Sequence, residues 1–180
     1  MLDTLAQYEA ISGQCRDVFV KKTKDYGTSW RVYRIISITD QIYIKAWRIR
    51  QIQQGGEQKI ADSIESEFAA IVNYGIMGLV QLALPDYDGQ LLDLEAACQA
   101  YDTEARKVKE LMLQKNHDYG EAWRNMNQES FADLILAKLL RIRQILGNDG
   151  KTLISEGIDA NFADIVNYAV FALIKMQWAN

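Results

Sequence analysis

The residues with the clearest chemical potential are acidic and lie near the end of the chain, in "SEGIDANFADIVN". On a helix, which turns about 100° per residue, four polar side chains of this segment share one face: Glu156, Asp159, Asp164 and Asn167. Carboxylate and amide oxygens are the ligands that magnesium prefers, and magnesium bridges readily to phosphates. The sequence therefore predicts Glu156, Asp159 and Asp164 as metal ligands and catalytic groups. A solvated acidic helix face is the alternative, because most charges on helices face solvent.

A second group of polar residues occurs once in each half of the chain. It consists of Asp40, Lys45 and Arg48 in the first half and Asp133, Lys138 and Arg141 in the second. Lysine and arginine three residues apart are neighbours on a helix. They can hold phosphate oxygens, or they can pair with carboxylates of an adjacent helix. Both interpretations stay open, and Asp133 is a further candidate metal ligand.

The sharpest local motif is Asp-Tyr-Gly followed by Trp-Arg, which also occurs twice. Its members are Asp25, Tyr26, Gly27, Trp30 and Arg31, and again Asp118, Tyr119, Gly120, Trp123 and Arg124. One interpretation is a loop whose aromatic rings stack on a base while the arginine reaches a phosphate. The other is a rigid corner in which glycine turns the chain and the aromatic rings fill the gap between helices. His117 is the only histidine, and Lys24 replaces it in the first half, which is unusual for a general base in a duplicated site.

These coincidences are parts of one tandem duplication. A spacing of 93 residues pairs Asp25 with Asp118 and continues through the segment "RIRQI" at positions 48 and 141. After one inserted residue the spacing becomes 94, which overlays "IESEFAAIVNY" on "IDANFADIVNY". A repeat of this kind sets the architecture of the whole chain.

Each copy is predicted to form three helices, because apolar residues recur at three and four spacing and the chain has a single proline. The first runs from about Leu5 to Lys22, or Leu91 to Gln114. The second starts behind Ser37 or Ser130, and the third covers about Lys59 to Leu84, or Leu153 to Trp178. We expect an all-α helical bundle in which residues 1–85 and 91–180, joined by the linker 86–90, pack as a pseudo-twofold dimer within one chain; a homodimer of chains also stays open.

The bulk properties exclude several classes of protein. A net charge of −4 argues against binding nucleic acid through a basic surface, although small anions remain acceptable ligands. The first residues lack a secretory signal, and the apolar runs are interrupted before they could span a bilayer, so we expect a cytoplasmic protein without a membrane anchor. Serine and cysteine nucleophile arrangements and glycine-rich phosphate loops are missing from the sequence.

A resemblance to a known family is carried by "KNHDYGEAW", by a middle segment with Lys and Arg-Ile, and by "EGIDANFADIVNY". Both copies resemble the nucleotide modification associated domain of phages and bacteria. The helical plan is also similar to all-α nucleoside triphosphate pyrophosphohydrolases of the MazG and dimeric dUTPase type. That resemblance implies acidic residues on adjacent helices that hold magnesium against a triphosphate while water attacks to release pyrophosphate. Carried over, the metal residues are Glu156, Asp159 and Asp164, with Asp62 and Glu65 as partners from the first copy.

The chain also departs from that pattern. Ala70 stands where the second copy has Asp164, although Glu67 is close by, and the preceding helix offers only Asp40 or Asp133 where the pattern has an acid pair. The leading hypothesis is a nucleotide-binding protein that uses magnesium, with triphosphate hydrolysis as its candidate reaction. Lys138 and Arg141 (Lys45 and Arg48 in the first copy) would neutralise phosphate, while Tyr119, Trp123 and Arg124, or Trp30 and Arg31, would contact the nucleotide beside Asp118. The alternative is a non-catalytic helical module that binds a nucleotide or a protein and keeps these residues as ion pairs between helices.

Overall fold

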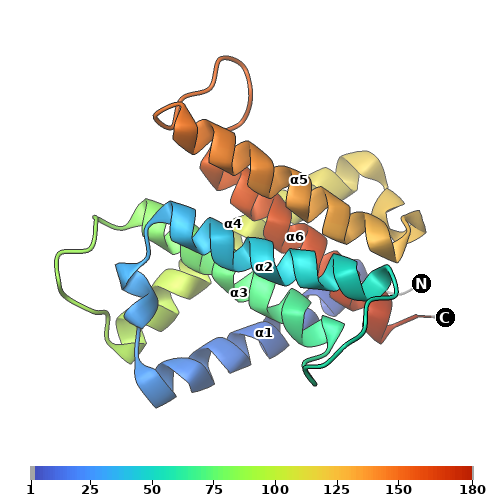
Figure 1. Cartoon of the computed structure of the whole chain (residues 1–180), viewed down its shortest axis with the longest axis horizontal. Coiled ribbons are helices and arrows are strands. Elements are labelled where there is room, and N and C mark those ends of the chain that lie inside the picture. Colours follow the sequence, from blue (N-terminus) through green and yellow to red (C-terminus); the bar gives the residue numbers. More distant parts are fainter. Residues whose placement is uncertain (1–2, 180) are drawn as a thin grey trace.

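The computed structural model describes residues 3–179, and over this range the chain is helical, without a strand. The α-helices are α1 (Thr4–Tyr26), α2 (Ile35–Gln53), α3 (Ile64–Ala83), α4 (Leu94–Tyr119), α5 (Gln128–Gly147) and α6 (Ile158–Gln177) (Figure 1). A short 3-10 helix follows α1 and another follows α4: η1 (Ser29–Val32) and η2 (Ala122–Asn125). The order α1, η1, α2, α3 is thus repeated as α4, η2, α5, α6. This confirms the predicted all-α fold with two repeats of three helices.

The helices α1 and α4 are longer than predicted. Both continue through Asp-Tyr and end at a glycine, Gly27 or Gly120, so the predicted ends at Lys22 and Gln114 were too early. Gly120 adopts the left-handed conformation at φ 59°, ψ 40°, and its amide donates to the carbonyl of Asn116 at 2.9 Å. Polar residues such as Lys and Asp do not stop a helix, whereas a left-handed residue does.

The second helix of each repeat begins earlier than predicted. The N-caps are Arg34 and Asn127 rather than Ser37 and Ser130, and neither makes a side-chain capping bond. The predicted serine caps were therefore wrong. Burial outweighs cap preference here, because Ile35, in the first turn of α2, packs against the core.

The third helix of each repeat begins later than predicted. Helix α3 starts behind Ser63, whose hydroxyl accepts from the amide of Ser66 at 3.1 Å, and α6 starts behind Gly157. Residues 153–157 are therefore loop, and Leu153 and Ile154 are 101% and 98% exposed. The prediction that Glu156 shares a helix face with Asp159 and Asp164 was wrong for this reason.

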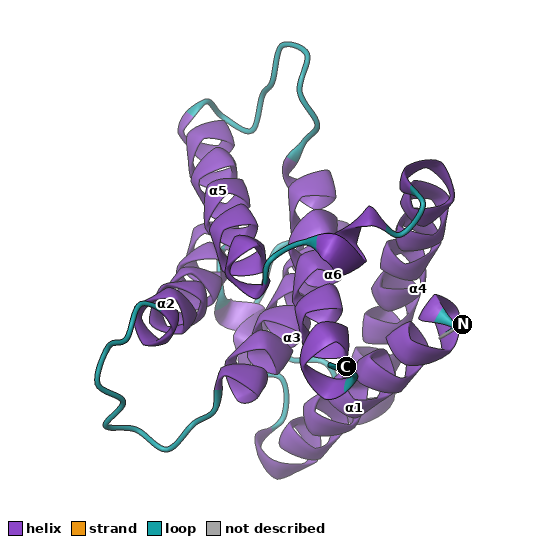
Figure 2. Cartoon of the chain, turned by 90° about the vertical axis from the view of Figure 1, so that its right-hand side faces the viewer, coloured by secondary structure: helices purple, strands orange, loops and turns teal. Residues whose placement is uncertain are grey.

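Helices α3 and α6 lie side by side at the centre of the bundle. Helices α2 and α5 pack on one side of this pair and against each other, and α1 and α4 cover the other side (Figure 2). The central contact is close because Gly75 of α3 faces Val166 of α6, and Gly78 faces the ring of Phe162. An added Cβ at Gly75 would lie 2.5 Å from Val166 Cγ2.

Reciprocal contacts across the centre show the pseudo-twofold arrangement. Tyr8 of α1 donates to Asn167 of α6, and Tyr101 of α4 donates to Asn73 of α3, both at 2.7 Å. On the opposite side of the bundle, the ion pairs are equally reciprocal: Arg143–Asp40 at 2.8 Å and Arg50–Asp133 at 3.3 Å. Equivalent residues therefore meet in pairs, as in a symmetric dimer.

One of these pairs contains Asp133, a predicted metal ligand. Asp133 lies at the exposed contact between α2 and α5, with a side chain that is 61% exposed and paired with Arg50. Asp40 occupies the same place in the other repeat. The retained aspartate thus joins the two repeats through an arginine of the partner helix.

By length and composition alone, α3 is apolar enough to cross a membrane, and it is the one such helix among residues 3–179. It packs against α2 and α6, and 56% of its apolar window is buried within the bundle. Its apolar surface is therefore used in the core.

Candidate functional site

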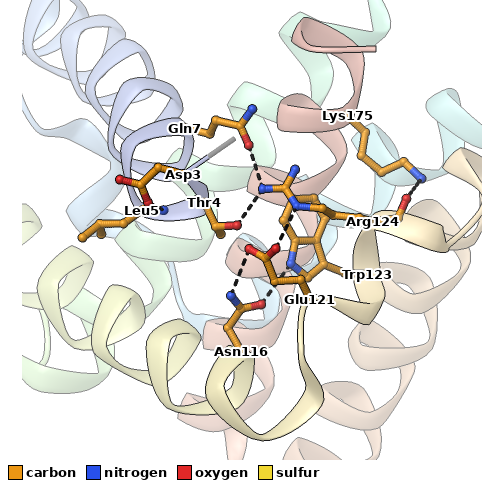
Figure 3. A network of polar contacts seen from close by, with 9 residues as sticks. All are labelled: Asp3, Thr4, Leu5, Gln7, Asn116, Glu121, Trp123, Arg124 and Lys175. Carbon is orange, nitrogen blue, oxygen red and sulfur yellow. Dashed lines mark hydrogen bonds and ion pairs between the residues drawn. The ribbon is translucent and has the colours of Figure 1, made fainter. Parts of the chain in front are cut away.

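The Trp-Arg corner of the second repeat is fixed by hydrogen bonds within the protein (Figure 3). Arg124 donates to Thr4 Oγ1 at 2.6 Å and to Gln7 Oε1 at 2.8 Å, both on α1. The indole of Trp123 donates to Asn116 Oδ1 at 3.1 Å. Arg124 thus ties η2 to the other repeat, and it would have to leave these partners to reach a phosphate.

The equivalent arginine of the first repeat is also occupied. Arg31 is buried and donates to Gln81 Oε1 and to the carbonyl of Pro85. In the second repeat Lys175 stands at the position of Gln81 and donates to the carbonyl of Arg124 at 3.0 Å. Because a lysine cannot accept, Arg124 turns to α1 instead. Both arginines thus have hydrogen-bond partners within the protein, which is the geometry that the rigid-corner interpretation expects.

The tryptophans of the two corners are core residues. Trp30 and Trp123 are 6% and 7% exposed. Phe171 lies parallel to Trp123 at a centroid distance of 4.3 Å, and Arg124 lies 4.4 Å from the same ring. At these distances the two groups must cover opposite faces of the indole, so the predicted stacking of a base on Trp123 does not fit. Tyr119, which is 75% exposed, keeps a free ring.

An ion cluster joins three helices of the second repeat. Asp164 of α6 is 6% exposed. Its Oδ1 accepts from Lys115 Nζ of α4 at 2.7 Å, and its Oδ2 accepts from Lys138 Nζ of α5 at 2.8 Å. Burial is the largest single influence on the pKa of Lys115 and lowers it, but the hydrogen bond and charge of Asp164, with smaller effects of Glu156 and Tyr168, raise the pKa above its ordinary value. Lys115 is therefore held charged beside the carboxylate.

The first repeat uses a different carboxylate. Glu67 of α3, with 5% of its side chain exposed, lies 3.3 Å from Arg48 Nη1 and 3.6 Å from Lys45 Nζ. Arg48 also donates to the carbonyls of Ile60 and Asp62 at 3.1 and 2.9 Å, in the loop before α3. The pairs of Lys45, Arg48 and Lys138 with acids of the third helix are the geometry that the ion-pair alternative expects.

The remaining predicted acids do not form a metal cluster within residues 3–179, although Glu156 lines a cavity together with Lys138 and Asp164. Asp159, Glu156, Asp62 and Glu65 are exposed. Asp118 is 78% exposed and lies 3.2 Å from His117, which is also exposed. Within residues 3–179 no group of three or more His, Cys, Asp or Glu side chains is arranged to hold a metal. Both oxygens of Asp164 face ammonium groups, so the residues as placed do not fit a magnesium site.

Two adjoining cavities open on either side of Lys138. The second-repeat cavity, of about 400 Å³, lies between α4, η2 and α6 and is lined by Tyr119, Trp123, Tyr168 and Phe171 together with Lys115 and Asp164. The loop cavity, of about 870 Å³, lies between α5 and residues 148–157. Lys138 and Glu156 line both. One cavity is aromatic and the other polar, and they meet at a lysine.

Two cations of the loop cavity have no side-chain partner among residues 3–179. Arg141 and Lys151 make no side-chain hydrogen bond or ion pair within the described range, and both are exposed. Lys151 and Lys115 were not predicted as site residues. The repeat contained the signal for Lys115, because Lys22 occupies the matching position; Lys151 lies in the loop where the spacing changes, so nothing marked it.

The comparison with known families agrees with the repeat. A family model described as nucleotide modification associated domain 1 matches the chain twice, over residues 22–82 and 115–176. No curated protein and no solved structure matched the chain. Because the two matches span more than half of the chain and start and end at equivalent places in each repeat, the chain belongs to the nucleotide modification associated domain 1 family and carries the domain twice.

Proposed function

We propose that the second repeat binds a nucleotide, with its phosphates in the loop cavity and its base in the second-repeat cavity. One observation carries the proposal: an aromatic cavity and a cation-lined cavity adjoin and share Lys138 and Glu156. Four cations and two carboxylates line the pair, Lys115, Lys138, Arg141, Lys151, Asp164 and Glu156, in a chain whose net charge is −4. A local excess of positive charge attracts an anion against the overall charge of the protein.

Arg141 is the main residue proposed to bind the phosphates. Its counterpart Arg48 pairs with Glu67 and donates to loop carbonyls, whereas Arg141 has no such partner in the described part of the chain. A guanidinium offers two parallel donors to phosphate oxygens, and Lys151 adds a charge from the loop. These two residues can bind phosphate without breaking an existing contact.

The base end rests on Tyr119 and Tyr168. Tyr119 presents an exposed ring, and burial raises the pKa of Tyr168, which keeps its hydroxyl neutral as a hydrogen-bond donor. Trp123 contributes only its edge, because both faces of its indole are covered. A base stacked on a tyrosine ring would be stabilised by about 1–3 kcal/mol.

Magnesium and hydrolysis remain finer predictions. The carboxylate of Asp164 would need to release Lys115 or Lys138 before it could ligate a metal. A magnesium ion that arrives on the triphosphate would meet Glu156 at the junction of the two cavities. The name of the family supports nucleotide chemistry without naming a reaction, and a relationship to MazG-type enzymes stays a prediction.

Calorimetric titration with ribo- and deoxynucleoside triphosphates, with and without magnesium, tests the proposal. Arg141→Ala is expected to weaken binding about tenfold, because it removes a charge-assisted hydrogen bond to phosphate. Arg106→Ala is the matched control, since Arg106 is exposed on α4 and lines neither cavity. Equal affinities of the two variants, or no binding by the wild-type chain, would contradict the proposal.

Pyrophosphate release in the same samples tests the reaction. Release that requires magnesium and is lost in Asp164→Asn would establish a triphosphate pyrophosphohydrolase. Binding without release would leave a nucleotide-binding module, in which Asp164 serves to orient the two lysines.

A further inference from the structure

The first repeat contains a cavity at the place equivalent to the second-repeat cavity. This first-repeat cavity has a volume of about 250 Å³ and lies between α1, η1 and α3. Six of its lining residues have counterparts that line the second-repeat cavity: Phe19, Lys22, Thr23, Trp30, Ala70 and Met77. Their counterparts in the other repeat, by the spacings of 93 and 94 residues, are Met112, Lys115, Asn116, Trp123, Asp164 and Phe171. The duplication thus made two cavities, and four of these six positions then changed the charge, polarity or shape of the lining.

Trp30, which lines the cavity, carries a donor without an acceptor. The indole nitrogen of Trp30 is buried and makes no hydrogen bond within residues 3–179. In the second repeat, Trp123 donates to Asn116, but Thr23 occupies that position here and its hydroxyl donates to the carbonyl of Phe19. A buried donor left unpaired costs about 1–3 kcal/mol, so a ligand acceptor that reached Trp30 Nε1 would recover that free energy.

The lining also defines the charge of the ligand. Ala70 replaces the carboxylate of Asp164, while Glu67 faces Lys45 and Arg48 and neutralises them. Lys22 lines the cavity and is exposed, and it pairs with no acid within residues 3–179. The lining therefore offers one exposed lysine where the second repeat has four cations, and it offers no carboxylate for a metal.

The remaining surface suits a flat ring. Phe19, Tyr74 and Met77 supply aromatic and sulfur contacts, and Met77 replaces the phenyl group that covers the tryptophan in the other repeat. Methionine adapts readily to a ring placed against it. The volume is just below the usual range of about 300–1,000 Å³ for drug-sized ligands, which favours a small heterocycle.

We propose that the first-repeat cavity is a second ligand site, which takes an uncharged planar heterocycle of the nucleobase class. A ring nitrogen or carbonyl oxygen of the ligand accepts the hydrogen bond from Trp30 Nε1. This site differs from the one proposed for the second repeat, because its lining has one cation where the cavity pair of the second repeat has four. It also stands independently, since none of its lining residues belongs to the other cavity pair.

The test follows the indole N–H signals of the ¹⁵N-labelled chain by NMR during titration with adenine, hypoxanthine, cytosine and uracil. The chain has four tryptophans, and Trp30→Phe assigns the signal of interest. At least one base is expected to move the Trp30 signal downfield in a saturable way. By calorimetry, the same base should bind about tenfold more weakly to Trp30→Phe, as expected for one lost hydrogen bond to a buried donor.

Two further variants complete the design. Ala70→Phe fills the cavity and should abolish the shift, whereas Trp47→Phe, on an exposed part of α2 outside both sites, should leave it unchanged. A Trp30 signal that stays unmoved by all four bases at millimolar concentration, or a shift that persists in Ala70→Phe, would overturn the proposal. The effect of Arg141→Ala on triphosphate binding reports on the second repeat alone, so the two proposals can fail separately.

Discussion

The two repeats share one arrangement of helices and differ in the position of one buried carboxylate. In the first repeat Glu67 lies near the start of α3 and faces Lys45 and Arg48. In the second repeat Asp164 stands about one helical turn further along α6, at the position of Ala70, and faces Lys138 and Lys115. Each repeat thus neutralises its central lysine, but with an acid from a different turn of the third helix.

This shift decides which arginine is free. Asn161 occupies the position of Glu67 in the second repeat and donates to the carbonyl of Gly157, so Arg141 has no acid at that position and makes no ion pair within residues 3–179. Arg48, by contrast, is held by Glu67 and ties down the loop before α3. Both repeats therefore keep the same Lys and Arg, but of the two equivalent arginines Arg48 is paired and Arg141 is left open to an anion.

The largest expected effect comes from removing the acid of the second repeat. Asp164→Ala should lower the free energy of unfolding by about 3 kcal/mol, because it leaves Lys138 charged and nearly buried; the value is at the low end for buried pairs since Lys115 is 42% exposed. Glu67→Ala should cost less, about 2 kcal/mol, because its partners are farther away and Arg48 keeps its carbonyl contacts. Urea denaturation at neutral pH measures both. A larger loss for Glu67→Ala would reverse the comparison.

The central helix pair gives the next largest effect. Gly75→Ala should destabilise the chain by about 2 kcal/mol, since the new methyl group meets Val166 in a packed core. The equivalent residue of the second repeat is Ala169. Gly13→Ala is the matched control: nothing lies within 4 Å of its added Cβ, so higher helix propensity should stabilise α1 by up to about 1 kcal/mol. In thermal unfolding, we expect the melting temperature of Gly75→Ala to fall and that of Gly13→Ala to rise.

A transplanted carboxylate tests whether the two ion clusters are interchangeable. In a Glu67→Gln background, Ala70→Asp should recover about 1 kcal/mol of stability, because an acid at position 70 can reach Lys22 and Lys45 as Asp164 reaches its two lysines. The double variant and the single variant are compared by urea denaturation. Further destabilisation by Ala70→Asp would mean that the frames of the two repeats are not equivalent at this position.

The smallest effects are expected at the exposed contact between α2 and α5. Arg50→Ala and Arg143→Ala should each cost about 0.5 kcal/mol, as is usual for exposed ion pairs. Arg143→Ala should cost slightly more, because the Arg143 guanidinium also lies 4.3 Å from the ring of Tyr43. Unfolding measured at low and at high salt should show both losses shrinking as salt is added. Losses that do not respond to salt would indicate that packing, not charge, matters there.

The repeat made the fold predictable to a large extent. Matching segments at a fixed spacing predicted two equal helical halves, and the apolar periodicity predicted three helices in each. The ends were less accurate, because they depend on contacts made in the folded chain. Ile35 extends α2 backward by packing on the core, and residues 153–157 leave α6 although their composition resembles a helix.

The candidate site was predictable in its members more than in its geometry. Lys138, Arg141 and Asp164 were predicted, and the structure brings Lys138 and Asp164 together. The sequence could not assign Arg124 to α1, because that contact depends on a lysine at position 175 in place of a glutamine. Nor could the sequence show that Asp133 pairs with Arg50, because Arg50 belongs to the other repeat.

The sequence by itself determined the duplication, the helical periodicity and the set of charged residues kept in both copies, because these are local patterns or internal identities. Tertiary structure decided which charges neutralise one another, since ion pairs join helices that are far apart in the chain. It also decided that Trp123 is covered on both faces while the nitrogen of Trp30 is left without an acceptor. Those outcomes depend on how the helices pack, because packing sets which of the residues that differ between the repeats line each cavity and which of them meet.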